Sequence, residues 1–222
     1  MIDRALRADP RLPVAKKFNI EIRPNDLGTL RPGIWLNDEV INYYGQMVMA
    51  RNKAHPELHP KVHIFNTFFY EKLQTEPFYE NVRRWTKKAK VNVFEIDKVI
   101  APLHFGNHWA CGVINMRDKR IEYYDSLGPS YAAEVFKNLR DYVKYEYADK
   151  QRGQFSFNGW TDYAPKNGPR QNNGQDCGVF TALFMAHAAA GGVPLRFEGD
   201  VPSYWRRRLM AEILLGHLGL GA

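Results

Sequence analysis

Residues 171–182 read Gln-Asn-Asn-Gly-Gln-Asp-Cys-Gly-Val-Phe-Thr-Ala, and they join two different kinds of sequence. A polar loop precedes Cys177, and an apolar run with helical spacing follows it as far as Ala190. The thiol is therefore expected at or near a helix N-terminus, where unpaired N–H groups and the positive dipole end favour the nucleophilic thiolate. Gly174 and Gly178 leave room for backbone or substrate to approach closely. A cysteine that opens a core helix can also be purely structural, so the rest of the chain has to decide.

The composition is that of a soluble globular protein. The chain has 222 residues, 45% hydrophobic and 25% charged, which is enough for a full core in one large or two small domains. A net charge of +7 favours an acidic partner or a basic face. Only Cys111 and Cys177 are present, the first ten residues are charged, and the apolar stretch 179–193 is too short for a membrane span. These features predict a reducing compartment.

Two further residues suit a cysteine nucleophile. Strand patterns at 99–103, 109–114 and 120–125, separated by turns, predict an antiparallel meander. Such a meander brings His108 and Asp125 to the same edge, opposite each other or one pair apart. A thiol, a histidine base and a carboxylate that fixes the base's tautomer are the parts of a nucleophilic triad, and Gln171 can offer an N–H to an oxyanion. His104 and His187 are rival bases.

The remaining pattern predicts helices around these strands. Asn37 is a good N-cap for a helix from Asp38 to about Asn52. Further helices are expected at 131–147, 179–190 and 202–218, with helical pieces within 64–95, a strand at 18–22 and loops at 53–61 and 150–170. Residues 1–17 are expected to form a flexible lead. No linker divides residues 18–222, which predicts one α+β domain.

Two groups of residues each have a structural and a functional interpretation. His55, His59 and His63 stand at four-residue spacing, but Pro56 and Pro60 exclude a regular helix through them, so no metal site is expected. A basic cluster surrounds Trp85 and is either a solvated face or a surface for an acidic partner; its members are Arg83, Arg84, Lys87, Lys88 and Lys90.

Several short motifs occur in one order along the chain. They are Trp35-Leu36-Asn37-Asp38-Glu39-Val40-Ile41-Asn42, Phe65-Asn66-Thr67-Phe68-Phe69-Tyr70, Arg84-Trp85-Thr86, His108-Trp109, Tyr124-Asp125-Ser126-Leu127-Gly128 and Gln171 with Gly174-Gln175-Asp176-Cys177-Gly178. In these motifs the chain resembles the catalytic domain of the Ulp/SENP cysteine proteases, which process and remove the ubiquitin-like modifier SUMO. The resemblance covers roughly residues 18–218. Gln175 departs from it, because the family commonly has serine there.

The resemblance implies a papain-like fold, in which helices flank a central, mostly antiparallel sheet and the nucleophile lies at a helix N-terminus. It implies a triad of His108, Asp125 and Cys177, with Gln171 at the oxyanion position. Trp35 and Trp109 match the roof and floor of a narrow tunnel for the modifier's C-terminal Gly-Gly. Two indoles that close a slot admit only residues without a Cβ, which gives this match a physical logic. Asp38 matches a position that pairs with an arginine of the modifier.

The function implied is cleavage after the Gly-Gly terminus of SUMO. The enzyme would mature the SUMO precursor and release SUMO from target lysines, as a monomer without a cofactor, in the nucleus (including the nuclear envelope) or the cytoplasm. One alternative is the same chemistry on a Nedd-type modifier or ubiquitin. Others are a non-catalytic modifier-binding module and a nucleic-acid binder. The intact set of Cys177, His108, Asp125 and Gln171 argues against the module, and scattered basic residues without a recognised motif argue against nucleic acid.

Overall fold

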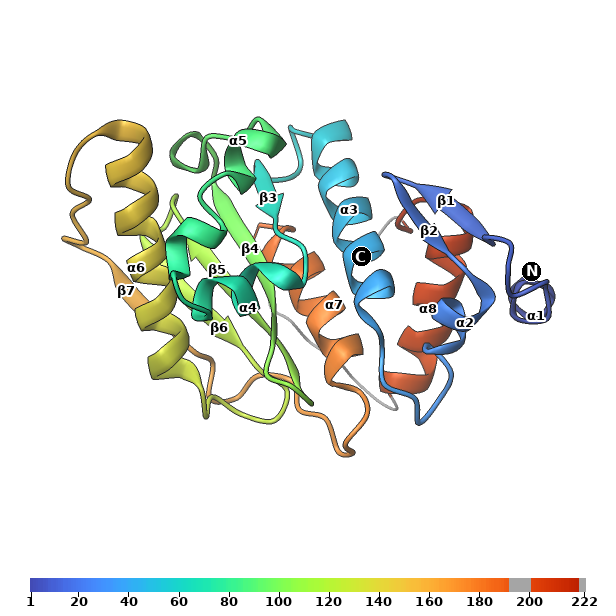
Figure 1. Ribbon diagram of the computed structural model, residues 1–222. Coiled ribbons are helices and arrows are strands. Elements are labelled where there is room, and N and C mark those ends of the chain that lie inside the picture. Colours follow the sequence, from blue (N-terminus) through green and yellow to red (C-terminus); the bar gives the residue numbers. More distant parts are fainter. Residues whose placement is uncertain (192–200, 220–222) are drawn as a thin grey trace.

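The computed structural model describes residues 1–191 and 201–219, and its centre is a five-stranded sheet (Figure 1). The strands follow the order β3-β4-β5-β6-β7 across the sheet. Their bounds are Val62–Ile64 for β3, Lys98–His104 for β4, Trp109–Asn115 for β5, Arg120–Tyr124 for β6 and Thr161–Tyr163 for β7.

The sheet is antiparallel in its centre and parallel at both edges. Strands β4, β5 and β6 form the predicted meander, while β3 pairs with β4 and β7 pairs with β6 in parallel. The sheet is therefore mixed, with its longest pairings antiparallel, and the α+β class is confirmed. Strands β3 and β7 were missed because three residues are too short to show a period-two pattern, and β7 falls in a segment expected to be a loop.

Helices are the other main elements of the described chain. The α-helices are α1 Ile2–Leu6, α2 Pro24–Gly28, α3 Asp38–Ala54, α4 Phe68–Gln74, α5 Trp85–Ala89, α6 Ala132–Gln151, α7 Cys177–Ala188 and α8 Val201–Leu215, with 3₁₀ turns η1 Phe78–Asn81 and η2 Val93–Glu95. Asn37 caps α3 as predicted, since its side chain accepts a hydrogen bond from the Val40 N–H at 3.2 Å. Within the described ranges, no helix combines the length and the apolar character needed to cross a membrane.

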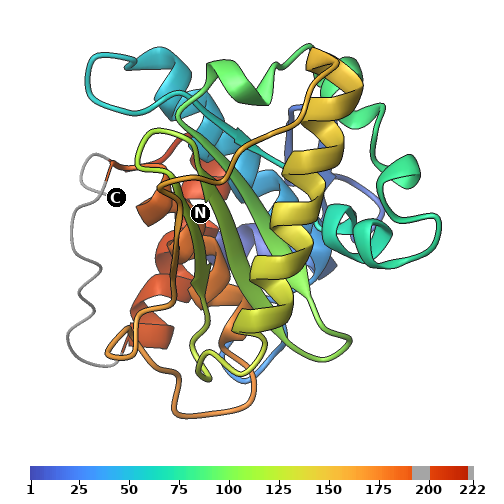
Figure 2. The same ribbon diagram turned by 90° about the vertical axis from the view of Figure 1, so that its left-hand side faces the viewer.

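The helices cover both faces of the sheet, and each face has its own hydrophobic core (Figures 1 and 2). Helices α3, α7 and α8 share one core, and α4, η1 and α6 share the other. Eleven of the twelve residues of α7 are buried, because this helix lies between the sheet and α3. A helix that is apolar on all sides is held from every direction, so the position of its first residue, Cys177, is well fixed.

Residues 1–17 differ from the expected flexible lead. Helix α1 packs against α2 and α8, and Ala5 is part of the core. Strand β1 (Ala15–Lys17) pairs with β2 (Ile20–Ile22) through a tight turn at Phe18 and Asn19, both with φ of 59°. The segment was predicted to be flexible because it is mostly polar and charged. A few of its apolar side chains nevertheless pack against the core, among them Ile2, Leu6 and Val14.

Candidate active site

Cys177 is the first residue of α7, as the sequence predicted. Its side chain is buried, with 3% of its surface exposed. The preceding loop is held by Asn173, whose side-chain oxygen accepts the backbone N–H groups of Gln175 at 2.9 Å and Asp176 at 3.1 Å. The thiol therefore sits on a rigid turn at the positive end of a buried helix.

A buried ion pair fixes the residue before the nucleophile. The Arg206 guanidinium donates to Asp176 Oδ1 at 2.6 Å, and the two side chains are 1% and 3% exposed. Arg206 also donates to the carbonyls of Thr29 and Arg31, at 3.1 and 2.9 Å. An amphipathic helix pattern at 202–218 would turn its three consecutive arginines partly outward, but Arg206 is buried. Its burial ties α8 and the segment that leads to Trp35 to the start of α7.

His108 and Asp125 are brought together by the meander. His108 Nε2 lies 2.8 Å from Asp125 Oδ1, and both side chains are buried. Cys111 pairs with Tyr124, so the continued register places Asp125 opposite Ala110, and its contact with His108 is diagonal rather than direct. Asp125 is held in turn by the Tyr123 hydroxyl at 2.5 Å and the Leu127 N–H at 2.8 Å.

The third contact joins His108 to Cys177. Cys177 interacts with the His108 ring closely enough to raise its pKa, and since Asp125 occupies Nε2, the other ring nitrogen, Nδ1, is left for the thiol. Burial alone lowers the pKa of His108, but the bonds to Asp125 and Cys177 and their negative charge outweigh it and raise the pKa to about 9. Burial tends to raise the pKa of Asp125, yet its bonds to His108, Tyr123 and the Leu127 N–H keep it lowered. The site therefore supports an imidazolium at His108 paired with the Asp125 carboxylate.

The two rival histidines have other surroundings. The His104 ring packs against Trp109 at a tilt of 32°, with ring centroids 4.2 Å apart, and burial lowers its pKa. His187 belongs to the last turn of α7, ten residues beyond Cys177, or about 15 Å along the helix. Of the three candidate bases, His108 is the one that is bonded to Asp125 and whose pKa Cys177 raises.

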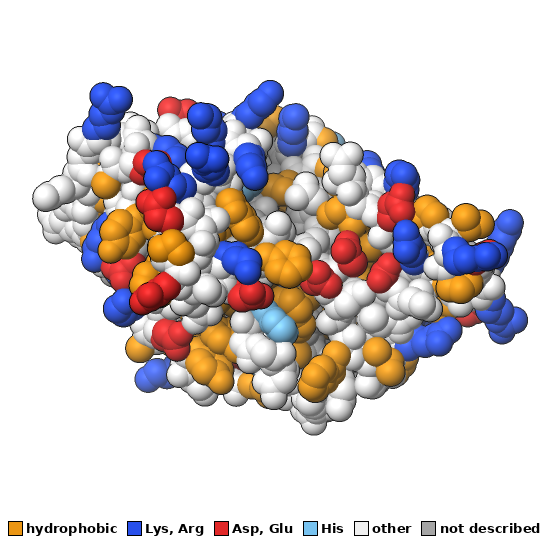
Figure 3. All heavy atoms as spheres, in the orientation of Figure 1, with side chains coloured by type: hydrophobic (Ala, Val, Ile, Leu, Met, Phe, Trp, Pro, Cys, Tyr) orange, Lys and Arg blue, Asp and Glu red, His pale blue; other side chains and the backbone are white. Residues whose placement is uncertain are grey.

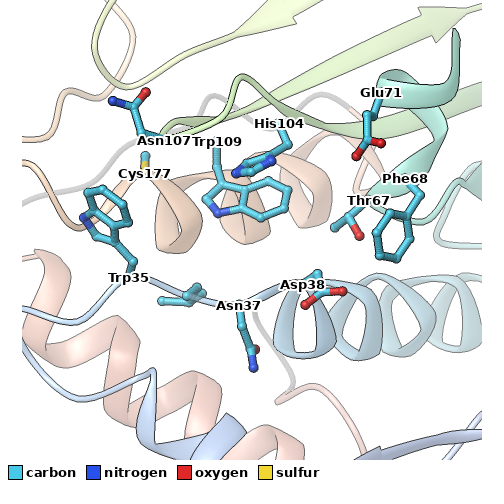
Figure 4. A pocket seen from close by; sticks show the side chains of 11 residues that line it. Trp35, Asn37, Asp38, Thr67, Phe68, Glu71, His104, Asn107, Trp109 and Cys177 are labelled. Carbon is cyan, nitrogen blue, oxygen red and sulfur yellow. The ribbon is translucent and has the colours of Figure 1, made fainter. Parts of the chain in front are cut away.

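A pocket of about 420 Å³ ends at Cys177 (Figure 4). Trp35 and Trp109 flank the sulfur end, and Asp38, Phe68 and Glu71 lie at the other end. Trp35 is 53% exposed and is anchored by a hydrogen bond from its Nε1–H to the Gly174 carbonyl at 2.8 Å, while Trp109 is 8% exposed. The remaining lining residues are Leu36, Asn37, Thr67, His104 and Asn107.

The outer end of this pocket is acidic (Figure 3). Asp38 opens α3 and lines the pocket, Glu39 follows it in the first turn, and Glu71 lies across from them on α4. Asp38 and Glu39 have no ion-pair partner within the part of the chain that the structure describes. Both carboxylates are stabilised by the positive end of the helix dipole, and both are free to pair with a cationic side chain of a partner.

The basic cluster lies over and just before α5, at the top of the face that Figure 3 shows. Arg83 is paired with Glu80 and Asp149, and the other four side chains are exposed. These exposed side chains agree with a solvated basic face and are equally accessible to an acidic partner.

Gln171 is linked to the triad through Ser126. The Ser126 hydroxyl donates to Gln171 Oε1 at 2.6 Å, and Gln171 Nε2 donates to the Asn173 carbonyl at 2.5 Å. The predicted residues thus fall into one region: His108, Asp125 and Cys177 touch, and Trp35, Asp38 and Trp109 line the pocket that Cys177 closes. Sequence reasoning did not assign Phe68, Glu71 or Ser126, although Phe68 and Ser126 lie within motifs that it singled out.

Comparison with known proteins places these features in a family. A family profile described as "Ulp1 protease family, C-terminal catalytic domain" matches residues 34–216. A sentrin-specific protease of Caenorhabditis elegans is 39% identical over 96% of the chain, and human sentrin-specific protease 2 is 35% identical over 96%. The chain spans only 30% and 36% of these two relatives. The crystal structure of the C-terminal Ulp1 protease domain in complex with Smt3, the yeast ortholog of SUMO, is 29% identical, with a TM-score of 0.82 over 97% of this chain and 92% of that one.

Proposed function

Because the chain belongs to the Ulp1 protease family, we propose that it is a cysteine protease that cleaves after the C-terminal Gly-Gly of SUMO. It would mature the SUMO precursor and hydrolyse the isopeptide bond between SUMO and target lysines. The observation that carries the proposal is the pocket that ends at Cys177, with two indoles beside the sulfur and free carboxylates at its mouth. The relatives named as sentrin-specific proteases, and the Ulp1 domain bound to Smt3, support SUMO as the modifier.

The proposed reaction uses the contacts of the site in sequence. His108 takes the Cys177 proton, and the thiolate attacks the carbonyl carbon of the terminal glycine. Gln171 and backbone N–H groups at the start of α7 stabilise the resulting oxyanion. The His108 imidazolium then protonates the departing lysine amine, which leaves a thioester on Cys177. His108 next activates a water molecule, which hydrolyses the thioester and releases the modifier with a free carboxylate. Asp125 keeps the ring oriented and stabilises its charge throughout.

Selectivity for Gly-Gly follows from the space around the sulfur. Trp35 and Trp109 stand on either side of the approach to Cys177 (Figure 4). A side chain at either of the last two substrate residues would meet an indole, whereas glycine has no Cβ to place there. At the mouth, Asp38 and Glu39 would receive basic side chains of the modifier. The slot thus supplies specificity for the chain end, and the acidic rim supplies specificity for the modifier's folded part.

We predict that activity falls on the alkaline side near pH 9. The raised pKa of His108 means that the ring stays protonated, and paired with the Asp125 carboxylate, up to about pH 9. The charge on the ring is lost as the pH rises through that value. Asp125→Asn keeps the shape of the carboxylate but removes its charge, so the alkaline limb of kcat/KM should move to lower pH. A fluorogenic substrate ending in Gly-Gly measures both profiles, and an unchanged limb in the variant would contradict this account of the histidine.

An activity-based labelling experiment tests the proposed function. The protein is incubated with SUMO, a Nedd-type modifier and ubiquitin, each carrying an electrophile at its C-terminus. A covalent adduct is expected with the SUMO probe, formed through Cys177 and identified by peptide mass spectrometry. Cys111→Ala is the matched control, because it removes the other thiol, which is fully buried and whose pKa burial raises. Preference for another probe would replace SUMO by that modifier, and no adduct with any probe would leave a binding module.

For location, the proposal is a reducing compartment, either the nucleus or the cytoplasm. Two free cysteines and the resemblance to the SUMO protease family support it. Imaging of the tagged full-length protein tests it, and a secreted or lumenal distribution would refute it.

A further inference from the structure

Ser126 directly follows the carboxylate of the triad and is buried, with 1% of its surface exposed. Its hydroxyl donates to Gln171 Oε1 at 2.6 Å. Its carbonyl accepts the backbone N–H of Gln171 at 3.1 Å. One residue therefore holds both the main chain and the side chain of Gln171, across 45 positions of sequence.

The partners of the Gln171 amide fix its orientation. A backbone carbonyl can only accept, so the 2.5 Å contact with the Asn173 carbonyl identifies the Nε2 end of the amide. The Ser126 hydroxyl, which donates to the other end, satisfies Oε1. An amide nitrogen carries two N–H groups, and Asn173 takes one of them. A single N–H of Gln171 is left for a substrate.

We propose that Ser126 is a positioning residue for the oxyanion donor: its hydroxyl holds the Gln171 amide so that this remaining N–H is directed at the developing charge. The proposal rests on the proposed function and adds to it a residue to which neither the family resemblance nor the pocket lining assigns a role. An amide free to rotate about its last torsion would present oxygen as readily as nitrogen to the oxyanion. The hydroxyl bond removes the wrong orientation before the substrate arrives, which is what preorganised electrostatic stabilisation requires.

The surrounding contacts strengthen the link between base and oxyanion donor. Arg170 donates to the Asp125 carbonyl at 3.4 Å, so Arg170 and Gln171 lie beside Asp125 and Ser126. Gly128 has a φ of +120°, and a Cβ there would stand 2.8 Å from the Arg170 guanidinium. The dipeptide Asp125-Ser126 therefore orients two groups at once: Asp125 orients His108, and Ser126 orients Gln171.

A double-mutant cycle between Ser126 and Gln171 tests the proposal. Removing an oxyanion donor outright costs about 10²- to 10³-fold in kcat. Ser126→Ala leaves the amide in place but held only by its bond to the Asn173 carbonyl, so kcat should fall by about 10- to 100-fold with KM unchanged. In a Gln171→Ala background, Ser126→Ala should have no further effect, because the group that it positions is gone. Independent, multiplicative losses would overturn the proposal.

Three measurements separate this role from a merely structural one. Alkylation of Cys177 by iodoacetamide forms no oxyanion, so its rate and pH profile should match wild type in Ser126→Ala; a slower reaction would mean that Ser126 acts through Asp125 and His108 instead. Ser126→Thr retains the hydroxyl and should recover part of kcat, and no recovery in a folded variant would count against the hydroxyl. Ser130→Ala, an exposed serine in the same loop, should leave kcat unchanged. The proposed hydrolase activity itself is tested separately, by labelling of Cys177 with the modifier probes. Failure of the proposed function and failure of the role of Ser126 therefore give different results.

Discussion

Cys177→Ser is expected to reduce turnover by at least about 10⁴-fold while modifier binding stays close to wild type. Serine fits the same buried position, so the pocket and its acidic mouth are retained. A serine hydroxyl, however, is far less acidic than a thiol, so His108 cannot generate a comparable nucleophile from it. The nucleophile is lost, and the slot that recognises the substrate is kept.

Two measurements are needed for this variant. Hydrolysis of a SUMO precursor, followed by gel or mass spectrometry, gives the loss in kcat/KM, and calorimetric titration with mature SUMO gives the binding constant. Cys111→Ala serves as the control for removing a thiol, because Cys111 lies on β5 in the core. Near-normal hydrolysis by Cys177→Ser would sink the assignment of Cys177 as nucleophile.

The parts of the site that the sequence predicted are those governed by local rules. Asn37 lies directly before an amphipathic run, and helix capping chemistry alone marks it as the start of α3. Cys177 lies where a polar loop meets an apolar helix pattern. His108 and Asp125 follow from two turns in a meander, since a hairpin fixes which residues share an edge. Each of these predictions needed fewer than twenty residues of context.

The parts that it missed depend on contacts between distant segments. Arg206 stands among three arginines on an amphipathic helix, and only the folded chain shows that Asp176 and the carbonyls of Thr29 and Arg31 surround it. The bond between Ser126 and Gln171 likewise joins two loops whose lengths do not determine how they meet. The charged N-terminal segment was taken for a flexible lead because its few apolar residues have no partner within the segment itself. Buried polar groups are satisfied by whatever tertiary structure brings to them, and no local pattern encodes that partner.

Gly178→Ala is expected to lower kcat/KM by about 100-fold or more, because it forces apart the two sides of the slot. A Cβ built on Gly178 stands 2.7 Å from the Cβ of Leu36. Any residue other than glycine carries a Cβ, so the clash is not relieved by rotating the Leu36 side chain. Either the first turn of α7 or the chain segment around Leu36 has to move. Leu36 lies next to Trp35, so the indole and the sulfur shift relative to each other, and displacements of about 1 Å cost on the order of 10² in rate.

Gly174→Ala provides the matched comparison for stability on the other side of Cys177. A Cβ there meets nothing within 4 Å, and Gly174 is not among the glycines with positive φ. Its free energy of unfolding in urea should stay within about 0.5 kcal/mol of wild type, whereas Gly178→Ala should lose about 1–3 kcal/mol from overpacking. Kinetics are compared at a temperature where both variants are folded by circular dichroism. Wild-type kcat/KM in a folded Gly178→Ala protein would mean that the close contact between α7 and Leu36 does not set the geometry of the slot. If kcat/KM of Gly178→Ala instead falls by more than its fraction of unfolded protein explains, catalysis depends on the width of the gap between Trp35 and Cys177.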